Sequence, residues 1–323
     1  MHVHAGPSAA RRHVEGCEAV SLSAGELEAT FVPERGMVGV SLLHAGDELL
    51  DRRGGLRAYA DRGAVMGIPF LHPWANRLAG FSYSLHGRDV RLPSGPPLVH
   101  CDEHGLPIHG LLAGSRYWEV VALDADGDRA RVHAALDFGA HAELMAAFPF
   151  RHEVMLEAAL TSTRLTITTR IRATGGAPVP ISFGFHPYLR LPGSDRAGWQ
   201  VALPARRHLL LDDRGVPTGE TEDRPATEFA LADRQFDDGY DGLADGAEFS
   251  VSDGDRKLAV TFERGYPVGQ VFAPARSPFI CFEPMTAPTN ALLSGVGLRR
   301  VMPGREFAAT FSITVRGGFT RKR

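Results

Sequence analysis

Residues 153–173, "EVMLEAALTSTRLTITTRIRA", decide the fold class. In each half of this stretch apolar and polar side chains alternate, which is the period of a β-strand with one face in the core and one in solvent. Only residues 161–163 separate the two halves, so we predict an antiparallel hairpin. The apolar positions that define it are Val154, Leu156, Ala158, Leu160, Leu165, Ile167 and Ile171.

The same alternation returns on both sides of this hairpin, in residues 81–92, 249–262 and 307–315. Glycine-containing turn signals interrupt the first two of these stretches, and turns recur along the chain about every ten residues. The 36 Gly and 22 Pro supply the residues that such turns need. We therefore predict an all-β fold, a large antiparallel β-sandwich, rather than alternating strands and helices.

Helices are expected to be few and short. The best candidates are residues 140–148 ("AHAELMAAF") and 225–236 ("PATEFALADRQF"), and neither carries a long apolar stripe. No repeat, low-complexity tract or linker divides the chain, so we predict a single domain over residues 16–323. Residues 1–15 are predicted to form a loose N-terminal tail.

The composition excludes several classes of partner. A formal net charge of -3 at pH 7 gives no electrostatic reason to expect nucleic acid or an anionic membrane surface. The cysteines, Cys17, Cys101 and Cys281, have no Cys-x-x-Cys spacing, so neither a disulfide framework nor a cysteine zinc site is indicated. No window approaches the roughly 18 apolar residues that span a bilayer, and no signal-peptide core opens the chain. We expect a soluble cytoplasmic monomer or homodimer that acts on a neutral, polar small molecule.

Four stretches place hydrogen-bonding side chains next to Gly and Pro between apolar strands. They are "HPWANRLAG" with Asn76 and Arg77, "LPIHGLLAG" with His109, "FGFHPYLRLP" with His186, and "ICFEPMTAPTNAL" with Glu283. A carboxylate at the end of a buried strand needs a partner or a ligand, which makes the last stretch the most informative. Each residue alone has a structural alternative: an ion pair for Glu283 and Arg77, core packing for His186, and a turn for His109.

Taken together, the amino-acid sequences of these stretches resemble those of one protein family. "PWANRL", "PIHGLLAGSRYWEV", "FGFHPYLRLPG" and "CFEPMTAPTNAL" are similar, in this order and at comparable separations, to the aldose 1-epimerases, or galactose mutarotases. The resemblance runs from about Glu18 to Val315. It implies a galactose mutarotase-like supersandwich whose long curved sheet holds a sugar, and interconversion of α and β anomers without a metal or other cofactor.

The resemblance also implies roles for individual residues. Glu283 matches the general base of the family and His186 its general acid. Arg77 and His109 match the residues that orient the sugar and its ring oxygen, and Asn76 is expected beside them in the binding site.

A family aspartate that binds sugar hydroxyls is expected within "RQFDDGYDGL", where Asp237 is the best match and Asp238 the next. Trp74, Trp118 and Tyr188 would suit stacking on a sugar face, although packing in the core or at the rim is equally open for each.

The sequence departs from the best-known galactose enzymes after His186, which is followed by Pro187 and Tyr188 rather than by Ser-Tyr-Phe-Asn. The His-Pro-Tyr sequence resembles that of a divergent bacterial branch of the family, so the identity of the aldose stays open.

The chemistry of anomers gives an independent reason for this set of residues. A cyclic hemiacetal opens when a base removes the proton of the anomeric hydroxyl while an acid protonates the ring oxygen, and reclosure on the other face inverts the anomer. One carboxylate and one imidazole are enough for this. We expect a protonated His186 facing an ionised Glu283 across the sugar.

Three alternative functions remain. The stretch "HCDEHGLPIHG" crowds potential metal ligands into ten residues, but it lacks the helical spacing of known zinc motifs. A non-catalytic carbohydrate-binding or sensing protein of the same fold would need no matched acid and base. A hexose-6-phosphate 1-epimerase would need extra cations for the phosphate, for which Arg116, Arg190 and Arg276 are candidates. The potential metal ligands are His100, Asp102, Glu103, His104 and His109.

Overall fold

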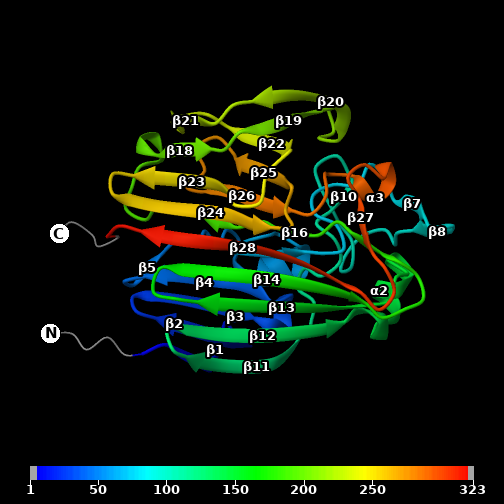
Figure 1. Cartoon of the computed structure of the whole chain (residues 1–323), viewed down its shortest axis with the longest axis horizontal. Coiled ribbons are helices and arrows are strands. Elements are labelled where there is room, and N and C mark those ends of the chain that lie inside the picture. The colour runs from blue at the N-terminus through cyan, green and yellow to red at the C-terminus, as the bar shows by residue number, and fades with distance from the viewer. Residues whose placement is uncertain (1–5, 319–323) are drawn as a thin grey trace.

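The computed structural model describes residues 6–318 and consists mainly of antiparallel strands in two stacked layers (Figure 1). The first layer is a nine-stranded sheet. In spatial order it contains β11 (Glu119–Asp126), β12 (Arg129–Asp137), β13 (His152–Leu160), β14 (Arg164–Ala173), β28 (Glu306–Arg316), β24 (Arg256–Arg264), β23 (Ala247–Asp253), β18 (Gln200–Leu203) and β21 (Thr227–Ala230).

The second layer consists of two sheets side by side. A five-stranded sheet packs on β11–β13 and contains β1 (Ser8–Val14), β2 (Cys17–Ala24), β3 (Leu27–Val32), β4 (Val38–His44) and β5 (Asp47–Glu48). An eight-stranded sheet packs on the β23 half of the first layer. It contains β20 (Pro217–Arg224), β19 (Arg206–Leu211), β22 (Phe236–Asp241), β25 (Val268–Ala273), β26 (Ile280–Met285), β16 (Gly184–Phe185) and β6 (Phe70–Leu71), with β17 (Tyr188–Leu189) also paired to β26.

The remaining elements are small. Three strand pairs are β7 (Ser82–Leu85) with β8 (Arg88–Arg91), β9 (His100–Cys101) with β10 (Pro107–Ile108), and β15 (Val179–Ile181) with β27 (Arg299–Val301). The α-helices are α1 (Gly55–Arg62), α2 (Ala142–Ala147) and α3 (Ala291–Ser294), and the 3-10 turns are η1 (Pro33–Arg35), η2 (Phe138–Ala140) and η3 (Arg196–Gly198). Among the described residues, no helix has the length and apolar character that a membrane span requires.

The predicted hairpin at residues 153–173 is confirmed as β13 and β14. Its register places Leu160 opposite Leu165 and Val154 opposite Ile171, so the apolar residues of both strands share the buried face. The prediction of a large antiparallel β-sandwich with few short helices is confirmed as well.

Two local predictions were wrong. Residues 8–14, expected in a loose tail, form β1, which pairs along its whole length with β2; residues 1–5 lie outside the described part of the chain. The stretch 225–236 is not helical: residues 227–230 form β21, whose alternating half-buried and exposed residues pair with β18. The other expected helix, 140–148, is present as α2, whereas α1 carried no sequence signal that we recognised.

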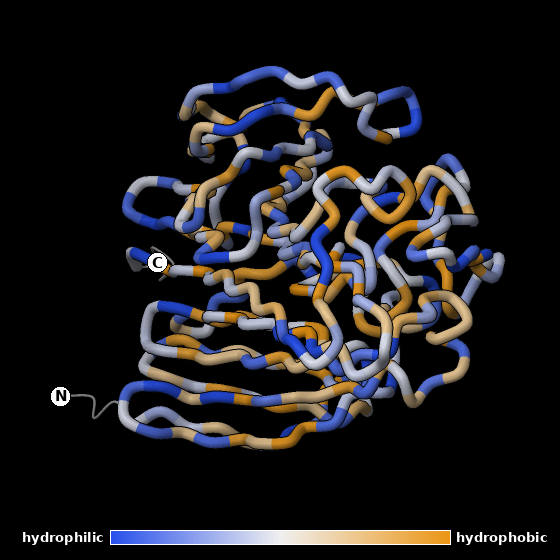
Figure 2. Tube along the Cα trace, turned by 45° about the vertical axis from the view of Figure 1, so that its right-hand side comes forward, coloured by the Kyte–Doolittle hydropathy of each residue, from blue (hydrophilic) through white to orange (hydrophobic). Residues whose placement is uncertain are grey.

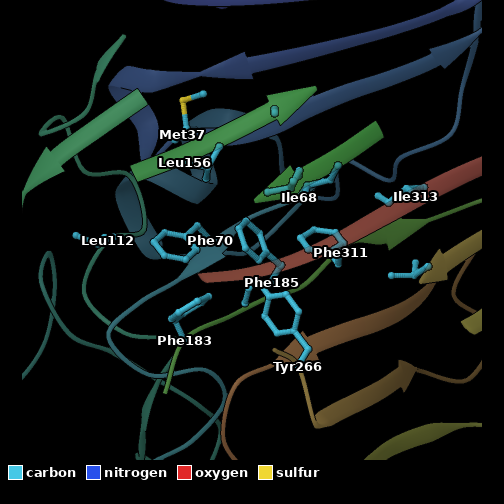
Figure 3. Close-up of a cluster of buried hydrophobic side chains, with 14 of the residues drawn as sticks. Met37, Ile68, Phe70, Leu112, Leu156, Phe183, Phe185, Tyr266, Phe311 and Ile313 are labelled. Atoms are coloured by element: carbon cyan, nitrogen blue, oxygen red, sulfur yellow. The ribbon is translucent and has the colours of Figure 1, made fainter. Parts of the chain in front are cut away.

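An aromatic cluster between the layers fixes the strand that leads to His186 (Figure 3). Phe185 packs against Phe70 and Phe311, with ring centroids 5.0 Å and 4.9 Å away. Phe183 packs edge-on against Tyr266 at 6.0 Å. Because strand side chains alternate between faces, burying Phe183 and Phe185 in this cluster directs His186 to the opposite face of the sheet.

The outermost strand of the eight-stranded sheet is protected by charge. β20 reads "PTGETEDR" and is exposed along nearly its whole length, and it forms the hydrophilic upper edge in Figure 2. Charged side chains on an edge strand discourage pairing with other chains, which keeps this edge of the sheet from aggregating.

Two buried imidazoles, His72 and His152, lie among the rings of Phe138 and Phe148. Their Nε2 atoms are 2.8 Å apart, and His152 Nδ1 lies 2.6 Å from the carbonyl oxygen of Phe150. Since a carbonyl only accepts, His152 Nδ1 carries the proton there and His72 Nε2 donates to His152 Nε2. Burial lowers the pKa of both imidazoles, that of His152 to about 4, so both are neutral at pH 7.

We predict that these imidazoles make the fold less stable as the pH falls from about 7 to 5. The unfolded histidines titrate near 6.5 and the folded ones well below, so the unfolded chain binds more protons in this window. Each such group changes the free energy of unfolding by up to about 1.4 kcal/mol per pH unit. Urea unfolding of the double variant His72→Leu/His152→Leu should show a shallower pH slope than wild type. An unchanged slope would contradict this account.

Candidate functional site

The site residues lie on the outer face of the eight-stranded sheet, away from the core between the layers. Phe282 packs on Phe249 of β23, so Glu283, the next residue of β26, faces outward. The register of the neighbouring strands extends this outer face from β26 to β25 and β22, since Gln270 lies opposite Glu283 and Asp237 lies opposite Phe272. Strands β22, β25 and β26 therefore place Asp237, Gln270 and Glu283 on one surface.

A cavity of about 430 Å³ opens on this face. Its apolar wall contains Val65, Ile108, Tyr188, Phe272 and Pro274. Its polar wall contains Arg53, Asn76, Arg77, Glu103, His109, His186, Asp237 and Glu283.

Glu283 and His186 are in direct contact. Oε1 of Glu283 lies 3.1 Å from Nε2 of His186, and the two side chains are 1% and 6% exposed. Burial, with Asp237 adding to it, raises the pKa of Glu283 well above its usual range, and burial lowers the pKa of His186 well below its own. Both shifts favour the uncharged forms, so the pair shares one proton, which Glu283 carries and donates to His186.

The contact differs from the expected arrangement of an ionised Glu283 and a protonated His186 held apart by a sugar. Desolvation opposes both charges while the two groups touch in a buried site. Glu283 Oε2 and His186 Nδ1 are buried and make no hydrogen bond within the described residues. Buried polar atoms nearly always have partners, so the pair retains hydrogen-bonding capacity for a polar ligand.

Arg77 is held at the other end of the polar wall by three carboxylates. Its Nε lies 2.6 Å from Asp102, and its Nη2 lies 3.4 Å from Glu103 and 3.5 Å from Asp237. Gln270 Nε2 donates to Asp237 at 2.7 Å and fixes that side chain. Arg77 is thus a preorganised cation surrounded by acceptors, which suits recognition of hydroxyl groups.

Asn76 and His109 owe their positions to backbone pairing. Arg77 forms an isolated bridge with Ile108, and His109 N donates to the Asn76 carbonyl at 3.0 Å. Asn76 and His109 both adopt left-handed backbone, with φ of 57° and 63°. A Cβ at Gly110 would lie 2.2 Å from the His72 carbonyl oxygen, so only glycine permits this close approach.

His109 joins the cavity beside His186, with the two rings edge to face at 5.5 Å. Burial lowers the pKa of His109 to about 3, and the charge of Arg77 adds to the shift. A neutral imidazole can donate or accept a hydrogen bond, and His109 Nδ1 is buried with no partner within residues 6–318.

Four other residues that the sequence offered as candidates have different outcomes. Tyr188 lines the cavity, and its ring stacks on His186 at 4.5 Å with the planes 7° apart. The prediction for Trp74 was wrong, because its ring is fully buried in the core and no face is open to a sugar. The prediction for Asp238 was also wrong. Asp238 lies on the opposite face of β22 from Asp237 and accepts a hydrogen bond from His208 Nε2 at 3.2 Å. Trp118 is packed in the core against Phe70.

The metal alternative finds no support in the local geometry. Within residues 6–318 no group of three or more His, Cys, Asp or Glu side chains could hold a metal ion. In the histidine-rich stretch, Asp102 and Glu103 bind Arg77 instead.

A second hollow of about 560 Å³ lies at the β19–β20 end of the sheet and contains three arginines. Arg207 binds Asp241 and Arg224 binds Glu222, while Arg206 donates to backbone carbonyls. Arg206 Nε is buried without a partner within the described residues, but the hollow has no pair of proton-transfer groups like Glu283 and His186.

Two polar residues of the cavity region, Gln270 and Arg53, were not identified from the sequence. Gln270 sits in "VGQVFA", where a polar residue in a buried strand is the signal that could have found it. Arg53 follows Asp51 and Arg52 in an ordinary charged turn, and no local pattern distinguishes it.

Comparison with known proteins places this geometry in a family. A sequence model described as aldose 1-epimerase matches residues 18–314. The chain belongs to the aldose 1-epimerase family. The predicted resemblance is therefore confirmed over nearly the whole chain, and this family comprises epimerases.

Relatives of this aldose 1-epimerase family member are distant in sequence. The uncharacterized protein YihR of Escherichia coli K12 is 24% identical over 311 residues, covering 93% of this chain and 94% of the relative. A galactose mutarotase-like protein from Clostridium acetobutylicum superposes with a TM-score of 0.85 at 20% identity, over 97% of this chain and 99% of that one. Galactose 1-epimerase from Lactobacillus acidophilus superposes with a TM-score of 0.74 at 14% identity, with the same coverage. The structural similarities show a shared fold.

We predict that Arg77→Ala destabilises the protein as well as its site. The side chains of Arg77 and Asp102 are 8% and 1% exposed, so the change leaves a buried carboxylate without its cation. Breaking a buried pair in this way costs about 3–5 kcal/mol. The control is Arg57→Ala, which removes a helix-surface pair whose side chains are 93% and 63% exposed and should cost under about 1 kcal/mol. Equal midpoints for both variants in urea unfolding would refute the prediction.

Proposed function

We propose that the protein is an aldose 1-epimerase that interconverts the α and β anomers of an aldohexose. The observation that carries this proposal is the buried contact between Glu283 and His186, two residues of the cavity wall whose second polar atoms, Oε2 and Nδ1, have no hydrogen-bond partner within the described residues. A binding protein needs no matched acid and base, so the pair favours catalysis over a purely sugar-binding role.

The two protonation states of the pair correspond to two stages of the reaction. With a cyclic sugar bound, Glu283 is the carboxylate and His186 the imidazolium. The carboxylate takes the proton of the anomeric hydroxyl, the imidazolium gives its proton to the ring oxygen, and the bond between C1 and the ring oxygen breaks. The open-chain aldehyde then faces a protonated Glu283 and a neutral His186.

This second state is the uncharged pair that burial favours. After rotation about the C1–C2 bond, His186 takes the proton back from the former ring oxygen while Glu283 protonates the aldehyde oxygen. The ring closes on the other face, and both groups return to their starting forms. The site therefore needs no proton from solvent, because in each half of the cycle one group of the pair takes a proton from the sugar while the other group gives one to it.

The other polar residues would hold the sugar around this pair. Arg77 is fixed by its carboxylates and offers hydrogen-bond donors, while Asp237 offers an acceptor for hydroxyl groups. His109 stands next to His186 and can bond an adjacent sugar oxygen as a neutral imidazole. Holding the pyranose in one orientation converts a loose encounter into an aligned proton transfer.

We predict that the purified protein accelerates equilibration of anomers of at least one aldose in polarimetry or anomer-exchange NMR. Glu283→Gln and His186→Asn should each lower kcat/KM by about 10²- to 10⁴-fold, because each removes one proton-transfer group. The matched control is Asp238→Asn, which alters a carboxylate on the opposite face of β22 and should retain wild-type activity.

Melting temperatures near that of wild type would show that the loss is chemical. Near-wild-type turnover of folded Glu283→Gln would exclude Glu283 from the mechanism. No acceleration of any sugar by wild type would favour the alternative of a non-catalytic carbohydrate-binding protein.

A further inference from the structure

Arg53 is a cation in the wall of the cavity that no carboxylate neutralises. Its guanidinium Nη1 donates to the Tyr188 hydroxyl at 3.2 Å, and its Cζ lies 5.4 Å from the Tyr188 ring and 5.8 Å from the Phe279 ring. No ion pair joins it to a carboxylate anywhere in residues 6–318. The nearest acid in sequence, Asp51, accepts from the Arg53 backbone N–H at 2.8 Å and leaves the guanidinium unpaired.

Arg53 differs in this respect from the other arginine of the cavity wall and from the arginine that precedes it in sequence. Arg77, the other cation in the cavity wall, is paired with three carboxylates. Arg52, the adjacent residue, is paired with Glu15 outside the cavity. The cavity therefore has one end where acceptors surround a cation and another where a cation stands without an anion.

The backbone holds Arg53 at this place. Asp51 N donates to the Tyr188 carbonyl at 2.9 Å, and Gly55 N donates to the Arg52 carbonyl at 2.7 Å, which closes a tight turn. Arg53 itself adopts left-handed backbone with φ of 43°. The guanidinium lies against two aromatic rings and uses one N–H on Tyr188, so other N–H donors remain for a ligand in the cavity.

We propose that Arg53 determines substrate specificity by binding an oxyanion on the sugar, so that the preferred substrates are acidic aldoses rather than neutral ones. This inference rests on the proposed function. A guanidinium forms charge-assisted, often bidentate hydrogen bonds to carboxylate, phosphate or sulfate oxygens, and these are stronger than bonds to a neutral hydroxyl.

The position of Arg53 also indicates where the anion lies on the sugar. Arg53 bonds Tyr188, and the Tyr188 ring stacks on His186, so Arg53 and His186 occupy the same end of the cavity. His186 serves the ring oxygen in the proposed mechanism. The ring oxygen is bonded to C1 and C5, and C5 carries C6, so an acidic group at C6 reaches the Arg53 end.

The cations that the sequence offered for a phosphate do not fill this role. Arg116, Arg190 and Arg276 are absent from the cavity wall, in which Arg53 and Arg77 are the arginines. The expectation of a neutral substrate, drawn from overall charge, is replaced in this proposal by the local charge of the site.

The test compares kcat/KM for glucose, glucuronate, glucose 6-phosphate and glucose 6-sulfate in wild type, Arg53→Gln, Arg53→Lys and Arg52→Gln. We expect wild type to prefer at least one of the acidic sugars. Arg53→Gln should lose about 10- to 150-fold on that sugar, the range for a hydrogen bond to a charged group, and little on glucose. Arg53→Lys should recover part of the loss because it restores the charge without the planar fork. Arg52→Gln, which removes a cation outside the cavity, should match wild type.

Equal kcat/KM of wild type for glucose and all three acidic sugars would overturn the proposal, as would an equal loss on neutral and acidic sugars in Arg53→Gln. Isothermal titration with glucose and the three acidic sugars separates this proposal from failure of catalysis. If no sugar is turned over, tighter binding of at least one acidic sugar than of glucose in wild type, with the difference lost in Arg53→Gln, still supports the role of Arg53. Equal binding of glucose and all three acidic sugars contradicts it.

Discussion

The burial of Glu283 against His186 is the interaction on which the rest of the site depends. A carboxyl group on a strand whose neighbours are Phe282 and Cys281 is destabilising unless it has a partner, and a lone charge there would cost far more than a neutral pair. The contact with His186 pairs Glu283 Oε1 with Nε2 and lets both groups stay uncharged. The core residues Phe183 and Phe185 keep His186 at the required distance because they fix its strand.

Around this neutral pair the fixed charges are separated in space. Arg77 and its carboxylates form one preorganised end, where little rearrangement is needed when hydroxyl groups bind. Arg53 forms the other end, where a cation lies on aromatic rings without a counter-ion. In the proposed function, the same sheet face combines proton transfer at its centre with selection of substituents at its ends.

The features that could be predicted from the sequence are those that depend on hydrophobic periodicity or on short sequence motifs. Strand alternation at 153–173 indicated the hairpin and the sandwich, and the four polar stretches indicated the residues that meet in the cavity. Features set by long-range packing were less accessible. The choice between Asp237 and Asp238 depends on which face of β22 lies toward the cavity, and the register with β25 decides that. Trp74 follows a buried strand into the core, and Arg53 gains its significance only because Tyr188, 135 residues away, lies beside it.

The protonation state of His186 tests the central claim most directly. The measurement is ¹⁵N NMR of the histidine-labelled protein without added sugar, with His186 assigned through the His186→Asn variant. The account predicts a neutral imidazole at pH 7 whose Nε2 lacks its own proton and accepts from Glu283, because burial disfavours both charges. An imidazolium with both ring nitrogens protonated at pH 7 would contradict it and show that the pair is a buried ion pair.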